Sequence, residues 1–182
     1  MLKLFKQVES VKRFAVENIN KDSINEPASA AEAQQLYEKD EKEFIKWALS
    51  LIDAKPVVRD DRIHGLLGFV ETGNKKQKII THVKGDKNLV PGMIQELTGV
   101  MEKEGAVIGL IISLHQPRLG MITDTVHAGS YESDLWKKKF LKIQIRTVAE
   151  LLEGKKFDIP QPYSLVKKSS KKKKPGETAK LL

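Results

Sequence analysis

Residues 62–85, RIHGLLGFVETGNKKQKIITHVKG, form the stretch around which the rest of the chain is organised. Their pattern indicates two β-strands, one over about residues 62–71 and one over about residues 77–84. Between them, residues 72–74 are Thr-Gly-Asn, which favours a tight turn because Gly and Asn tolerate the positive φ that hairpin turns need. The stretch therefore predicts a β-hairpin that closes at Gly85.

The end of the second strand carries two polar side chains where apolar ones would be expected. Side chains two residues apart on a strand share a face, so His82 and Lys84 point the same way as Ile80. The residues between them, Ile79, Thr81 and Val83, point into a core on the other face. His64, on the first strand, is expected to lie opposite. This placement indicates a binding or catalytic site.

The segments around the hairpin alternate between helical and extended patterns. A capping box at Ser29 and Glu32 predicts a short helix. A stronger helix starts at Asp40, because its apolar residues recur at helical spacing, and it ends before Pro56. Further helices are expected over residues 91–104, 118–128 and 147–153, and strands over 107–114 and 141–146. This order predicts an α/β fold with a mixed central sheet flanked by helices.

Charge is concentrated at one end of the chain. The net charge is +8, of which residues 167–182 supply +6, from seven lysines and one glutamate. The other 166 residues therefore carry only +2. The absence of cysteine suits a reducing compartment, and no apolar run is long enough to span a membrane, so we expect a soluble cytoplasmic protein.

These features divide the chain into three parts. We expect an N-terminal arm with a short helix over residues 1–39, one domain over residues 40–162, and a disordered lysine-rich tail over residues 163–182. The tail is a candidate nucleic-acid-binding arm, or simply a solvated segment. Its clustered lysines are Lys167, Lys168, Lys171, Lys172, Lys173 and Lys174. Lys75 and Lys76, at the hairpin turn, are weaker candidates for phosphate contact.

Several blocks of the chain, in this order, resemble the Mrr-type restriction endonuclease domain, and in particular the version found at the C-terminus of bacterial site-specific DNA methyltransferases. The blocks are EKDEKEFIKWALSLIDAKP (38–56), HVKG (82–85), MIQELTGVMEKEGAVIGLIISLHQP (93–117), AGSY (128–131) and IQIRTVAELLEGKKFDIP (143–160). The resemblance covers roughly residues 26–162. It implies a restriction-endonuclease-like three-layer sandwich, DNA as substrate and Mg²⁺ as cofactor.

The resemblance also implies where a nuclease site would lie. The family holds Mg²⁺ with the aspartate of a Gly-Ile-Asp-Gly motif on the first hairpin strand and with an acidic or polar group on the second, followed two residues later by a lysine. Here Arg62-Ile63-His64-Gly65 matches the motif, His82 occupies the second position, and Lys84 is retained. Imidazole suits Zn²⁺, Ni²⁺ or Cu²⁺ better than Mg²⁺. A normal magnesium site is therefore not expected.

Three interpretations of the candidate catalytic residues follow. In the first, the nuclease site is inactive and the domain binds DNA or a protein partner. In the second, Asp60 or Asp61 replaces the missing carboxylate and the domain is an active metal-dependent endonuclease, with Mg²⁺ as its cofactor. In the third, His64, His82 and Lys84 form a site of their own, for metal-free acid–base catalysis or a transition metal. His115 is expected to be a capping or packing residue.

We predict a DNA-associated domain of a restriction–modification system, with a degenerate nuclease site. An interaction module that docks on a DNA methyltransferase without cutting DNA is the alternative from another class. Double-stranded DNA, a methyltransferase and a second copy of the chain in a homodimer are the candidate partners, and no membrane partner is expected.

Overall fold

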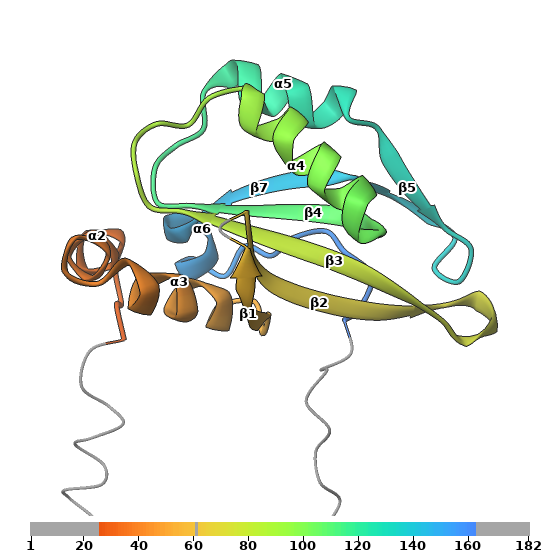
Figure 1. Ribbon diagram of the computed structural model, residues 1–182, viewed down its shortest axis with the longest axis horizontal. Helices are drawn as coiled ribbons and strands as arrows, with labels where there is room; N and C mark the ends of the chain where they lie inside the picture. Colours follow the sequence, from red (N-terminus) through yellow and green to blue (C-terminus); the bar gives the residue numbers. More distant parts are fainter. Residues whose placement is uncertain (1–25, 61, 163–182) are drawn as a thin grey trace, which may run out of the picture.

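The computed structural model describes residues 26–60 and 62–162, apart from the side chains of residues 58–60. In chain order, the elements are α2 (Ala30–Lys39), α3 (Glu41–Ser50), β1 (Lys55–Asp60), β2 (Ile63–Glu71), a 3₁₀ turn η1 (Thr72–Asn74), β3 (Lys75–Lys84), α4 (Gly92–Glu104), β4 (Ala106–Ser113), α5 (Leu119–His127), β5 (Ser130–Ser133), β6 (Lys138–Leu141), β7 (Ile143–Thr147) and α6 (Val148–Leu152). Figure 1 shows their arrangement. Within this part of the chain, none of the helices is long and apolar enough to cross a membrane.

Five strands form one mixed sheet in the order β1-β2-β3-β4-β7. The first three pair antiparallel, whereas β4 runs parallel to β3, and β7 runs parallel to β4. The parallel steps need crossover connections, which α4 and α5 supply. The predicted mixed α/β sheet is therefore confirmed.

Helices cover both faces of this sheet, with α4 and α5 on one side and α2, α3 and α6 on the other (Figure 1). Successive side chains of β4 point to opposite faces of the sheet and enter two separate cores. Ile111 packs against α4 and α5, whereas Leu110 and Ile112 pack on the other face. That second core also holds Phe44 and Trp47. Burial of a large apolar side chain contributes about 1.5–3 kcal/mol. The apolar stripe predicted for the helix after Asp40 is therefore a core stripe, and the three-layer architecture is confirmed.

The hairpin of β2 and β3 has the turn that its sequence predicts. Gly73 and Asn74 both adopt positive φ, at 72° and 60°, which their residue types tolerate. Residue pairs run in unbroken register from Glu71 opposite Lys75 to Gly65 opposite Thr81. On β3, Ile79, Thr81 and Val83 are buried, and Ile80 is buried on the other face. Both predicted faces are confirmed.

A second, two-stranded sheet was not expected from the sequence. Strands β5 and β6 pair antiparallel, with Tyr131 opposite Phe140. Their presence shortens the predicted strand over residues 141–146, because Leu141 belongs to β6 and β7 begins at Ile143. This small sheet lies beside the turn of the β2–β3 hairpin (Figure 1).

The buried carboxylate of Glu71 joins the two hairpins. Its Oε2 accepts a hydrogen bond from the Tyr131 hydroxyl at 2.7 Å, and its Oε1 accepts from the backbone N–H of Leu135 at 2.6 Å and of Thr72 at 3.0 Å. Burial alone would raise the pKa of Glu71, but hydrogen bonds from Ser133, Tyr131 and these backbone groups outweigh it and lower the pKa to about 2. Burial is the first cause that raises the pKa of Tyr131, to about 12, and the hydrogen bond to Glu71 is the second.

This carboxylate makes the fold sensitive to acid. Because the pKa of Glu71 is lower in the folded state than its ordinary 4.5, its contribution to the free energy of unfolding is complete above pH 4.5 and is lost as the pH falls toward 2. We expect Glu71→Gln to lower that free energy at pH 7 and to shrink its pH dependence between 4.5 and 2, as measured by urea denaturation at each pH.

Glu132→Gln is the matched control, because Glu132 is an exposed glutamate of β5 whose ion pair with Lys139 is worth little. Its profile should follow that of the unmodified protein. Identical profiles for the Glu71 and Glu132 variants would show that the buried carboxylate does not join the hairpins as described.

Candidate functional site

The start of β2 and the end of β3 bring two imidazoles together. With Gly65 opposite Thr81, His64 stands opposite His82. Their rings stack, with centroids 4.8 Å apart and planes inclined by 19°. The sequence prediction that these residues face one another is confirmed.

His64 makes a hydrogen bond with the protein backbone. The hairpin ladder ends at Gly65 and Thr81, and beyond it the backbone N–H of Val83 donates to Nδ1 of His64 at 2.9 Å. A ring nitrogen that accepts a hydrogen bond carries no proton, so a neutral His64 keeps its proton on Nε2. The Nδ1 lone pair is therefore engaged by the protein backbone.

The surroundings of His82 favour its neutral imidazole form. Its Nδ1 lies 3.1 Å from the carbonyl oxygen of Arg62, which can only accept, so this nitrogen is the donor. Burial, followed by the charge of Lys84, lowers the pKa of His82, against opposing effects from the Arg62 carbonyl, Glu96 and Asp86. His82 also lines a cavity of about 20 Å³ beneath α4, large enough for about one water molecule.

Lys84 is paired with the carboxylate of Asp86, which follows the end of β3. Its Nζ lies 2.6 Å from Oδ2 of Asp86, and Oδ1 of Asp86 accepts from the backbone N–H of Asn88 at 2.8 Å. Burial would raise the pKa of Asp86, but the hydrogen bonds and the positive charge of Lys84 lower it overall. The spacing Lys84-Gly85-Asp86 was the sequence signal that could have predicted this pair, because it places both side chains at the carboxyl end of β3.

His115 joins this cluster because β4 runs parallel to β3. Lys84 pairs with Ser113, so the carboxyl ends of the two strands lie side by side. The hydroxyl of Ser113 donates to the carbonyl of His115 and accepts from its backbone N–H at 3.1 Å. Among the described residues, Nε2 of His115 is buried without a hydrogen-bond partner. These contacts involve the backbone of His115 and not its imidazole, so its capping or packing role stays a prediction.

Gly85 allows this end of the sheet to be covered by α2. A Cβ placed on Gly85 would stand 2.3 Å from the ring of Tyr37, closer than carbon atoms can approach. Burial is the first cause that raises the pKa of Tyr37, followed by the charges of Glu41 and Asp86. The candidate site is thus closed on one side by an aromatic ring.

The remaining candidates are not part of this cluster. Lys75 and Lys76 are exposed at the start of β3, at its opposite end. The backbone of Asp60 pairs with Ile63 at the end of β1, but its side chain, the whole of Asp61 and the six clustered lysines of the tail lie outside the described residues. Replacement of the metal ligand by Asp60 or Asp61 therefore stays a prediction.

The described donors do not suit Mg²⁺, which prefers oxygen ligands in octahedral geometry. The imidazoles of His64 and His82 stack on each other, and Lys84 is paired with Asp86. Among residues 26–60 and 62–162, with the side chain of Asp60 left aside, no three His, Asp or Glu side chains are grouped so that they could hold a metal ion. The site offers two imidazoles and one ammonium–carboxylate pair.

Comparisons of this chain with protein-family models, with curated proteins and with solved structures found no match.

Proposed function

We propose that this chain is a DNA-associated domain with a restriction-endonuclease-like scaffold, which binds double-stranded DNA and does not cut it. The observation that carries the proposal is the engagement of His64, whose Nδ1 accepts the backbone N–H of Val83 at the position where the related motif has its metal-binding carboxylate. The mixed sheet and the retained Lys84 support the scaffold. The imidazole that replaces the aspartate supports the loss of hydrolysis.

The chemistry of phosphodiester hydrolysis explains why this substitution matters. A metal ion lowers the pKa of the attacking water and stabilises charge on the phosphate, and a nearby lysine adds positive charge. Lys84 instead lies 2.6 Å from Asp86, which neutralises much of its field. Neither group of the pair is then available to act on a phosphate without first separating from the other.

Two other functions are alternative proposals with less support. An active endonuclease would need Asp60 or Asp61 as its carboxylate ligand, with Mg²⁺ as its cofactor. A module that docks on a DNA methyltransferase, alone or as a homodimer, would use the same scaffold without any contact with DNA. All three place the chain in a restriction–modification system.

Binding that does not depend on a metal ion tests the proposal. We expect the full chain to bind a fluorescein-labelled 20-bp duplex with the same dissociation constant in EDTA and in Mg²⁺, once ionic strength is matched, because no metal ion bridges protein and phosphate. Fluorescence anisotropy measures both constants. Binding to the duplex that appears only with Mg²⁺ would favour the active endonuclease. No binding at about 50 mM salt would favour the module that docks on a methyltransferase.

A further inference from the structure

The described part of the chain has a strong separation of charge. By sequence, residues 26–162 hold equal numbers of basic and acidic residues, 20 of each, and are neutral. Two segments, residues 71–78 and 130–142, hold seven lysines against three acidic residues, a net charge of +4. The rest of this region therefore carries −4. A neutral body with one basic end can orient a negatively charged ligand toward that end.

These two segments lie together in space. They contain the turn between β2 and β3 and the hairpin of β5 and β6, which occupy the same end of the molecule, away from α2 and α3 (Figure 1). We call residues 71–78 and 130–142 the two-hairpin end. The Glu71 carboxylate holds both turns, through the backbone N–H groups of Thr72 and Leu135. The lysines are therefore carried by two turns that are both hydrogen-bonded to the same carboxylate.

Two large apolar side chains are exposed in the turn between β5 and β6. Leu135 is 52% exposed and Trp136 is 43% exposed, whereas Trp47 in the core is 7% exposed. The backbone N–H of Trp136 donates to the hydroxyl of Ser133 at 3.1 Å, and Lys137 adopts a positive φ of 50°. One hydrogen bond within the turn and one from Leu135 to Glu71 thus hold it, and it leaves Trp136 partly exposed to solvent.

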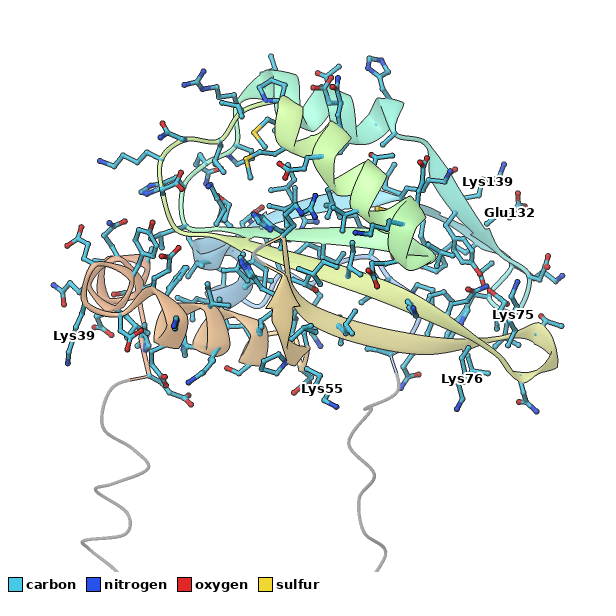
Figure 2. All side chains as sticks on the ribbon, viewed as in Figure 1. Lys39, Lys55, Lys75, Lys76, Glu132 and Lys139 are labelled. Carbon is cyan, nitrogen blue, oxygen red and sulfur yellow. The ribbon has the colours of Figure 1, made fainter. Side chains whose placement is uncertain are left out.

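Lysines lie at the same end of the molecule as this indole. Lys75, Lys76 and Lys137 have no carboxylate within 4 Å among the described residues. Lys138 and Lys139 pair with Asp158 and Glu132, but these pairs are exposed and contribute little, so phosphates can replace their partners. Figure 2 shows Lys75, Lys76 and Lys139 at this end of the molecule, and Lys39 and Lys55 elsewhere.

We propose that the two-hairpin end binds single-stranded DNA, with a base stacked on Trp136 and phosphates held by the lysines of this end. An exposed indole with lysines at the same end combines the two interactions that single-strand binding uses, because bases stack on aromatic rings while a basic surface follows the backbone. Inside a duplex both faces of each base are covered by neighbouring pairs. The indole therefore discriminates in favour of strands that expose base faces.

An anionic membrane surface would also attract lysines and an indole, but the geometry disfavours it. Membrane insertion needs apolar side chains that reach about 5–10 Å into the headgroup region. Trp136 is more than half covered by protein, and the Leu135 backbone is tied to Glu71. A half-covered ring on a fixed turn suits a planar base that comes to it.

This surface is separate from the cluster around Lys84. Strand β3 runs from Lys75 to Lys84, ten residues, so its two ends are about 30 Å apart. A DNA strand bound at the two-hairpin end is thus remote from Lys84. The inference rests on the proposed function for DNA as the class of ligand, and it adds the preference for single strands and the residues that produce it.

The test compares the full chain with two variants, using a labelled 15-nucleotide oligothymidine and a 15-bp duplex in fluorescence anisotropy. We expect Trp136→Ala to weaken single-strand binding by about 5- to 150-fold, the usual effect of removing one stacking ring, and to leave duplex binding nearly unchanged. Lys75→Ala/Lys76→Ala should weaken both. The matched control is Lys39→Ala/Lys55→Ala, which removes the same charge away from this end and should weaken neither. Tryptophan fluorescence should fall when the single strand binds, and Trp136→Phe should abolish that fall.

Unchanged single-strand affinity in Trp136→Ala would overturn the inference and leave duplex binding, and hence the proposed function, intact. Equal losses for both DNAs would also overturn it, because they indicate a wedge into duplex DNA. Binding to phosphatidylserine vesicles that depends on Trp136, with unaltered single-strand affinity, would assign the surface to a membrane instead. Failure of the unmodified protein to bind either DNA would contradict the proposed function itself.

Discussion

Removing residues 167–182 is expected to weaken binding to duplex DNA by about 10²–10³-fold at 100 mM salt. The segment contains six lysines within eight positions. Each phosphate neutralised adds about 0.9 to the slope of log affinity against log salt, so roughly three simultaneous contacts give a slope change of nearly 3 and a loss of this size. Anisotropy titrations at several salt concentrations measure both quantities. The folded body should keep a residual, less salt-dependent affinity.

A shorter deletion is the matched control. Removing residues 175–182 takes away one lysine and one glutamate and retains the six clustered lysines. Its affinity and salt slope should equal those of the full chain. If removal of residues 167–182 also leaves both quantities unchanged, the lysine-rich segment is not a phosphate-binding arm, and the hairpin lysines must account for any binding.

The hairpin shows how far the sequence could predict the structure. The alternation along residues 77–84 and the Gly-Asn pair in the turn determined both faces and the register, because a shift of one residue would have turned Ile79 and Val83 away from the core. A strand was likewise predicted over residues 107–114, and β4 is buried on both faces along most of its length. These are local patterns, and packing agreed with them.

Contacts between distant segments could not be predicted in the same way. The four-residue strands β5 and β6 are too short for a clear alternation, and their support comes from Glu71, which lies 60 residues before Tyr131. A glutamate in a strand normally indicates an exposed position. Here the hydroxyl and backbone donors that bury it belong to a hairpin that no local pattern revealed.

The candidate site was predicted in part. Its pairing of His64 with His82 followed from strand register, but the hydrogen bond from Val83 to His64 depends on where the ladder ends. Asp86 was missed as the partner of Lys84 because its residue type is typical of loops. His115 entered the cluster through parallel pairing of β3 and β4, which residue spacing alone does not determine.

The second prediction is that bound DNA is not cleaved. In the nuclease family that the sequence resembles, a carboxylate-bound metal ion activates water and stabilises phosphate charge, which account for most of the rate of hydrolysis, and His64 stands at the matching position here. We therefore expect no cleavage of bound DNA with Mg²⁺ or Mn²⁺. Asp60→Asn and Asp61→Asn should make no difference, whereas a displaced-carboxylate nuclease would lose its activity in one of them.

The most direct measurement incubates supercoiled plasmid with saturating protein and either metal ion, and divides each sample between a native gel and a gel run after protein removal. The proposal of DNA binding without hydrolysis predicts a retarded plasmid on the first gel and intact supercoiled plasmid on the second. Lys84→Ala should give the same pair of results, because Lys84 is held by Asp86. Nicked or linear plasmid with the unmodified protein, absent with Lys84→Ala, would contradict the proposal and show that the site is a working nuclease.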